Sequence, residues 1–172
     1  MRKGKWERDH MGNSIVKAQV DEVMLFLGET VQMLEDFLNQ TTLDDFKQGA
    51  SKDTDYHKSL LSNLRRLEVY CTEGLEACKI INKNKTFHKG AAEKTLYTIY
   101  HQCVEEFFSP RNDVWFEDSR SAYTGKNSIK FHQEVPDSFK GLVKELESGF
   151  QTIREDLEYY ETDYRTKMLQ SK

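Results

Sequence analysis

The residues best suited to chemistry in this chain gather between its two prolines, Pro110 and Pro136. This segment combines acids, arginines and aromatic rings within a short span. Carboxylates and guanidinium groups pair as bidentate forks, and exposed aromatic rings are common anchors at protein interfaces. The residues with these properties are Arg111, Asp113, Trp115, Glu117, Asp118, Arg120, Tyr123 and Lys126. They predict a surface that binds a protein partner or a small planar ligand. The structural alternative is a hairpin held to the fold by ion pairs, with its tryptophan covering the core.

A hydroxyl-rich stretch of the same segment has the composition of a phosphate-binding turn. Its members are Ser119, Ser121, Thr124, Gly125, Lys126, Asn127 and Ser128. The stretch is not a P-loop, because the first glycine of that motif is absent and Asn127 stands where the motif needs serine or threonine. Ordinary turn preferences explain the same residues and favour a simple hairpin turn.

Support for a metal or catalytic site is weaker. His101 and Glu105 are four residues apart on a predicted helix, a spacing that can offer two ligands to one metal. No second histidine-containing pair occurs on another predicted helix, so we expect an ion pair there, and no metal or other cofactor. No GxSxG, HExxH or glycine-rich dinucleotide motif occurs in the sequence. The chain therefore carries no recognisable catalytic motif.

Composition limits the class of protein. A chain of 172 residues with 37% hydrophobic residues can form one domain, and it has no apolar run long enough to span a membrane. The formal net charge of -4 argues against a nucleic-acid binder. The three cysteines, Cys71, Cys78 and Cys103, are odd in number and form no CxxC pair, which favours the cytoplasm.

Hydrophobic periodicity supplies the elements that must position these residues. Four stretches place apolar residues three or four positions apart, the pattern of a buried helical stripe. They predict helices at residues 14–39, 54–81, 89–108 and 137–168, with Asp53 or Thr54 capping the second. The expected core positions are Val16, Val20, Val23, Leu27, Val31, Leu34 and Leu38; Leu60, Leu64, Leu67, Cys71, Gly74 or Leu75, Cys78 and Ile81; Ala92, Leu96, Ile99, Cys103 and Phe107; and Leu142, Leu146, Phe150, Ile153, Leu157, Tyr160 and Tyr164.

The fold class predicted is therefore mainly α, with four long helices in an up-down-up-down bundle. Residues 1–13 are expected to form a flexible leader, and residues 14–172 a single domain. Alternating residues around TGKN at 124–127 predict a β-hairpin at about 110–136, between the third and fourth helices. Phe116, Tyr123, Ile129 and Phe131 are expected to pack on the bundle. A looser helical array with a small sheet is the alternative.

Two stretches, MGNSIVKAQVDEVMLFLGETV and FFSPRNDVWFEDSRSAYTGKNSIKFH, resemble the YpuI-like family of Bacillus and its relatives, a domain of unknown function. The resemblance covers nearly all of residues 11–172 and does not include the segment before Met11. It implies a cytoplasmic protein of a Gram-positive bacterium. It supplies no activity, catalytic residue or cofactor.

Two functional hypotheses follow. The first is a non-enzymatic interaction module that binds another protein or a second copy of itself through the hairpin surface, centred on Trp115 and Arg120. The second is a small-ligand protein or minor enzyme, with an anionic metabolite held between the hairpin and the third and fourth helices. The run of Tyr159, Tyr160 and Tyr164 extends the last core stripe and would also serve as a dimer seam.

Overall fold

The computed structural model describes residues 2–46, 53–118 and 127–170, and their side chains apart from those of residues 2–11, 164, 165, 167 and 168. The protein is mainly helical and carries a small antiparallel hairpin late in the chain. The elements are α1 (Arg2–Gln40), α2 (Leu43–Phe46), α3 (Thr54–Lys83), α4 (Lys89–Ile99), the π-helical turn η1 (Tyr100–Val104), α5 (Glu105–Phe108), β1 (Trp115–Glu117), β2 (Ile129–Phe131) and α7 (Asp137–Gln170). Within these ranges, no helix is long and apolar enough to cross a membrane.

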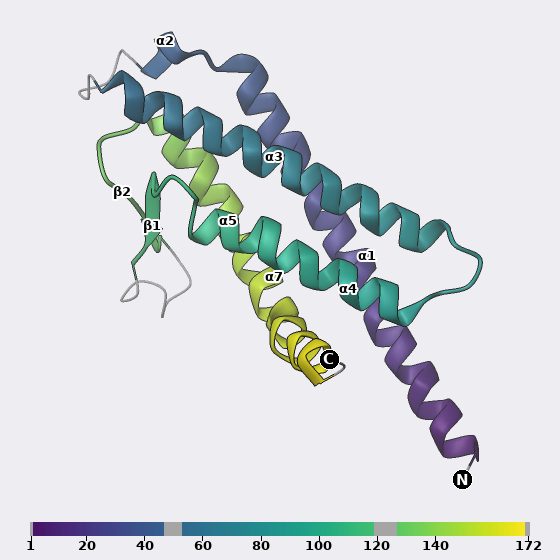
Figure 1. Ribbon diagram of the computed structural model, residues 1–172. Coiled ribbons are helices and arrows are strands. Elements are labelled where there is room, and N and C mark those ends of the chain that lie inside the picture. Colours follow the sequence, from purple (N-terminus) through teal and green to yellow (C-terminus); the bar gives the residue numbers. More distant parts are fainter. Residues whose placement is uncertain (1, 47–52, 119–126, 171–172) are drawn as a thin grey trace.

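The long helices lie side by side in Figure 1. The α3 helix turns back along α1, and the segment formed by α4, η1 and α5 turns back along α3 (Figure 1). The α7 helix contacts both α1 and α4. The hairpin lies at the end of the molecule where α3 and α7 begin (Figure 1). This arrangement places the hairpin strands against the first turns of α7.

The first helix is longer than its hydrophobic pattern predicts. It begins at Arg2, so the backbone of residues 2–13, expected to form a flexible leader, continues α1. The physical reason is that an established helix extends without a new nucleus, and this stretch has no proline to stop it. Hydrophobic periodicity predicted the buried part of α1, at residues 14–39, but not the polar part that precedes it.

The predicted core stripes are confirmed almost completely. On α1 the six positions from Val16 to Leu34 are buried, while Leu38 is only partly buried and packs against the core. On α3 the buried position is Gly74, and Leu75 packs at the edge. A Cβ on Gly74 would lie 3.0 Å from Ile99 and 3.1 Å from Leu27, so the glycine lets α3 approach both neighbouring helices closely. Tyr164 lies outside the described side chains.

The start of α3 is tied to the end of the hairpin. Asp53 caps the helix by accepting a hydrogen bond from the Tyr56 N–H at 3.1 Å, as predicted. Its other carboxylate oxygen accepts from the Gln133 side-chain amide at 2.9 Å. The Gln133 bond and then the Tyr56 bond hold the pKa of Asp53 below its ordinary value. The cap therefore also fixes the segment that follows β2.

A π-turn interrupts the third long helix. The Glu105 N–H donates to the Tyr100 carbonyl, so η1 contains one residue more than an α-helical turn would need. The inserted residue rotates the helix after it, and two consecutive rings, Phe107 and Phe108, are both buried. Phe107 stacks on Phe150 of α7 with centroids 4.3 Å apart. This turn brings α5 against α7 directly below the hairpin.

Glu22 of α1 lies beside Asp156 of α7, and this pair of carboxylates is expected to make stability depend on pH. Burial first, and then the charge and hydrogen bond of Asp156, raise the pKa of Glu22. The folded state therefore binds this proton more tightly than the unfolded chain, and the destabilisation is present above the raised pKa. It disappears as the pH falls through that pKa toward the ordinary glutamate range. The pair should thus weaken the fold at neutral pH and stop doing so in mild acid.

We expect Glu22→Gln to raise the melting temperature at pH 7, because a neutral amide is desolvated at lower cost than a carboxylate and is not repelled by Asp156, to which it can still hydrogen-bond. The gain should shrink as the pH is lowered toward the ordinary glutamate range. Calorimetric melting of both proteins across this range measures it, with Glu29→Gln, an exposed position on the same helix, as the control. A gain independent of pH would contradict the assignment.

Candidate functional site

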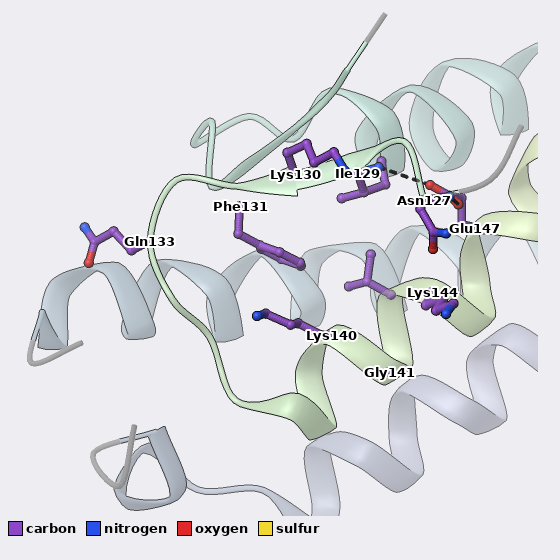
Figure 2. Close-up of a pocket in the computed structure, with 10 residues that line it drawn as sticks. Asn127, Ile129, Lys130, Phe131, Gln133, Lys140, Gly141, Lys144 and Glu147 are labelled. Carbon is purple, nitrogen blue, oxygen red and sulfur yellow. Dashed lines mark hydrogen bonds between the residues drawn. The ribbon is translucent and has the colours of Figure 1, made fainter. Parts of the chain in front are cut away.

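A groove between β2 and the first half of α7 is the candidate site. It has a volume of about 500 Å³, within the range of small-molecule sites. Its lining includes three lysines and the apolar residues Ile129, Phe131 and Val143. Figure 2 shows Lys140 and Lys144 on α7, and Lys130 and Phe131 on opposite sides of β2. The lining residues are Asn127, Ile129, Lys130, Phe131, Gln133, Lys140, Gly141, Val143, Lys144 and Glu147.

The lysines reach the groove from two elements. Lys130 stands on β2, while Lys140 and Lys144 are four residues apart on α7 and therefore share one face of that helix. Within the described part of the chain, no ion pair involves any of these three side chains. Like charges at this helical spacing repel by about 0.2–0.5 kcal/mol, so a bound anion would relieve the repulsion between Lys140 and Lys144.

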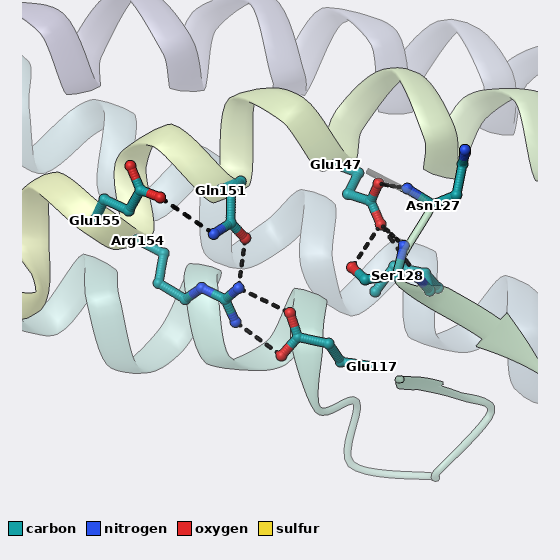
Figure 3. A network of polar contacts seen from close by, with 8 residues as sticks. Glu117, Asn127, Ser128, Glu147, Gln151, Arg154 and Glu155 are labelled. Atoms are coloured by element: carbon teal, nitrogen blue, oxygen red, sulfur yellow. Dashed lines mark hydrogen bonds and ion pairs between the residues drawn. The ribbon is translucent and has the colours of Figure 1, made fainter. Parts of the chain in front are cut away.

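A buried carboxylate holds one wall of the groove to the other. Glu147 of α7 is 4% exposed, and both of its oxygens accept hydrogen bonds from the chain just before β2 and at its first residue. Oε2 accepts from the Asn127 N–H at 2.6 Å, and Oε1 from the Ser128 N–H and hydroxyl, both at 2.8 Å. Oε1 also accepts from the Ile129 N–H at 3.1 Å. Figure 3 shows this convergence.

Backbone geometry explains why three successive N–H groups meet one side chain. Asn127 has a φ of 57°, in the left-handed region that asparagine adopts more readily than most residues. A residue in that conformation turns the following amides toward one side and forms a concave anion-binding nest. The predicted phosphate turn, residues 119–128, thus binds an anion with its last residues, and that anion is the protein's own Glu147. Residues 119–126 lie outside the described part of the chain.

An ion pair attaches β1 to α7. The Arg154 guanidinium forms a bidentate pair with Glu117, with Nη1–Oε1 at 2.9 Å and Nη2–Oε2 at 2.7 Å (Figure 3). The guanidinium carbon of Arg154 lies 3.7 Å from the centroid of the Phe108 ring, and the guanidinium also donates a short hydrogen bond to the Gln151 side chain. Glu117 therefore anchors the hairpin, which is the structural role that the sequence left as the alternative.

The structure places Trp115, the predicted centre of the interaction surface, in the core. Trp115 is fully buried, and its indole N–H donates to the Phe107 carbonyl at 2.6 Å. Phe116, predicted to pack on the bundle, is 41% exposed. Neighbouring residues of a strand point to opposite faces. A prediction that is shifted by one residue therefore places Phe116 in the core and Trp115 on the surface, the reverse of what the structure shows. Phe131 does pack against the core as predicted, with its ring 5.7 Å from that of Phe139.

The other predicted site residues do not converge on one place. Arg111 and Asp113 are exposed, and Asp113 pairs with His132 at 3.4 Å on the outer side of the hairpin. Asp118 donates its N–H to the Ser128 carbonyl at 2.6 Å and continues the strand pairing. None of these three lines the groove. The remaining predicted residues, Arg120, Tyr123 and Lys126, lie outside the described residues.

The weaker candidates have structural explanations. His101 Nδ1 lies 3.2 Å from Glu105 Oε2, which is the helical ion pair expected from the spacing. Among the described residues, no group of three or more histidine, cysteine or acidic side chains is arranged to hold a metal ion. The three cysteines are buried thiols. Burial raises the pKa of Cys78 to about 12, which leaves it unreactive at neutral pH.

The comparisons with known proteins agree with the resemblance noted in the sequence. A family model described as "Protein of unknown function (DUF3907)" matches residues 20–166. The chain belongs to this family. One relative, described as "Uncharacterized protein YpuI", of Bacillus subtilis (strain 168), is 43% identical over 153 residues, which is 89% of this chain and 86% of the relative. No solved structure matches the chain.

The groove lies inside the region that the DUF3907 model covers. Both of its walls, β2 and the part of α7 from Lys140 to Glu147, fall between residues 20 and 166. Sequence reasoning within the same region missed Lys130, Lys140, Lys144 and Glu147. The spacing of Lys140, Lys144 and Glu147 on one helical face was a readable signal, but nothing in the sequence indicated that β2 would lie across that face.

Proposed function

We propose that this protein is a binding protein whose groove between β2 and α7 holds an anionic ligand. The observation that carries the proposal is a groove with three lysines in its lining, two of them four residues apart on α7, whose one lining carboxylate is already occupied. Positive side chains around an apolar floor suit a ligand with negative charge and some apolar surface. The four hydrogen bonds to Glu147 support a preformed wall, which lowers the entropic cost of binding.

The chemistry of the lining supports binding rather than catalysis. Glu147 is the one carboxylate among the lining residues, and both of its oxygens are engaged by backbone and hydroxyl donors. It is therefore not positioned to take a proton from a ligand. Apart from its three lysines and Glu147, the described lining contains no side chain of a type that acts as a nucleophile. We infer that the long helices behind this groove run up-down-up-down. We also infer a reducing, cytoplasmic location, which the three buried thiols support.

A second candidate function is the interaction module, and the exposed ring of Phe116 favours it. Phe116 lies 5.0 Å from the ring of His132, and His132 pairs with Asp113. These residues and Arg111 form the outer face of the hairpin, on which a protein partner or a second copy would dock. Trp115 plays no part in this version of the hypothesis because it is buried.

The test of the groove is a thermal-shift series with inorganic phosphate, pyrophosphate and a dicarboxylate, each compared with sodium chloride at equal ionic strength. A ligand present at a hundred times its Kd stabilises the folded state by about 2.7 kcal/mol, which corresponds to a rise of about 5–10 °C for a domain of this size. We expect the double variant Lys140→Glu, Lys144→Glu to lose this rise.

The matched control is Lys79→Glu on α3, an exposed lysine outside the groove that reverses a charge in the same way. It should keep the stabilisation by the anion. If no anion stabilises the protein beyond sodium chloride, the proposed function is wrong. Stabilisation that is equal in the parent and the groove double variant would assign anion binding to another part of the surface.

A further inference from the structure

The β2 strand has one edge that β1 does not cover. The sheet described here has two strands, β1 and β2, paired antiparallel with Trp115 opposite Phe131, Phe116 opposite Lys130 and Glu117 opposite Ile129. In such a pair, backbone groups alternate between those bonded to the partner strand and those that face away from it. The alternation decides which backbone groups of β2 are presented outward.

The register assigns those groups. The Asp118 N–H donates to the Ser128 carbonyl, which places the next bonded pair at Phe116 and Lys130. Ile129 and Phe131 therefore direct their N–H and C=O groups to the outer edge. The Ile129 N–H is occupied by Glu147. Among the described residues, no hydrogen bond of the Phe131 N–H is found.

The outer edge of β2 faces the groove. Glu147 stands on α7 and bonds to the Ile129 N–H, so this edge looks toward α7. The same two elements form the walls of the groove, and Figure 2 shows Phe131 and Lys140 on opposite sides of it. A chain lying in the groove in an extended conformation would run beside the part of this edge at Phe131, with a helix along its other side.

We infer that the ligand of this groove is an acidic, extended segment of another protein, which adds to β2 as a third strand. The inference rests on the proposed function and names its ligand class. Strand addition explains the open backbone groups of Phe131, and the three lysines supply complementary charge for acidic side chains. Residues of a strand alternate between faces, so a segment alternating apolar and acidic residues would place one set on the Val143 floor and the other near the lysines.

The probe is the peptide acetyl-Glu-Val-Glu-Val-Glu-Val-amide, titrated into the ¹⁵N-labelled full chain and followed by the amide resonances. Two isomers, N-methylated at all glutamates or at all valines, carry the same charge and differ in which backbone donors remain. If the peptide binds as a strand, the N–H groups of one residue type, either the glutamates or the valines, face β2, and those of the other type face away. We expect the parent peptide to shift the Phe131 amide, and one isomer alone to bind more weakly by about tenfold, the effect of losing a hydrogen bond.

The double variant Lys140→Glu, Lys144→Glu should weaken the parent peptide, while Lys79→Glu should not. If both isomers bind as well as the parent peptide, strand pairing is wrong, although anion binding in the groove stands. Binding of pyrophosphate without any binding of the peptide would likewise overturn the strand and leave the proposed function. If neither the peptide nor the small anions bind, the proposed function itself fails.

Discussion

Replacement of Trp115 by alanine is expected to destabilise the protein by about 3–5 kcal/mol, the range for removing a large aromatic side chain from a core. The indole is fully buried and lies 6.1 Å, between ring centroids, from both Phe131 and Phe139. The substitution removes these contacts and leaves the Phe107 carbonyl without its 2.6 Å donor. Urea unfolding followed by circular dichroism at 222 nm measures the loss.

Trp115→Phe separates the two contributions. It keeps an aromatic ring in the cavity and removes the indole donor, so it should lose about 1–3 kcal/mol through the unpaired carbonyl and the smaller ring. Phe116→Ala is the matched control on the opposite face of the strand, and it should change stability by less than about 1 kcal/mol. If Trp115→Ala lowered the free energy of unfolding no more than Phe116→Ala, the tryptophan would be a surface residue. The interaction surface centred on Trp115, as first expected from the sequence, would then stand.

Replacement of Glu147 by alanine is expected to lower stability by about 2–4 kcal/mol. Four donors lose their acceptor, and the two from Ser128 are buried, so water replaces the carboxylate poorly there. The loss is local in origin, because Glu147 joins the beginning of β2 to the first half of α7. Amide hydrogen exchange at Ser128 and Ile129 should accelerate more than exchange in the helical core.

Glu147→Gln is the informative companion. It keeps one carbonyl acceptor and replaces the other oxygen by an amide that meets the N–H of Asn127 or Ser128, so its loss should be intermediate. Glu145→Ala, at an exposed position two residues earlier on α7, should have little effect. Equal losses for the variants at 145 and 147 would show that Glu147 contributes only helix charge and does not hold the groove wall.

The two predictions also bear on the proposed function in different ways. Trp115→Ala alters the core beneath the hairpin and removes a neighbour of Phe131, but it changes neither the lysines of the groove nor the hydrogen bonds of Glu147. Glu147→Ala releases the wall that carries Ile129 and Phe131. Anion binding that survives the first substitution and is lost in the second, measured under conditions where both variants are folded, is therefore expected if the groove needs a fixed β2.

Part of the candidate site was open to prediction. A hairpin between the third and fourth long helices follows from the strand-like residues flanking TGKN, and β1 and β2 lie there. The assignment of faces failed because each strand has three residues, too few for alternation to show which set points inward. Val114 and Trp115 are consecutive and both buried, which breaks simple alternation altogether.

Glu147 shows a different limit. It lies next to Leu146 on the edge of the buried stripe of α7, where a glutamate is ordinarily solvated. Only a nest of N–H groups from another part of the chain makes its burial favourable, and that nest depends on the left-handed conformation of Asn127. No local pattern around either residue identifies the other as its partner.

The sequence by itself determined the helices and their buried stripes, because a periodicity of three to four residues is repeated many times over each long segment and survives single exceptions. It also indicated the family and narrowed the cap of α3 to Asp53 or Thr54, of which the structure has Asp53; both predictions depend on residues close together in the chain. The tertiary structure alone decided which hairpin ring is buried, what Glu147 binds, and that three lysines from two elements surround one groove. Each of these depends on contacts between segments distant in sequence, where packing and hydrogen-bond satisfaction outweigh local preference.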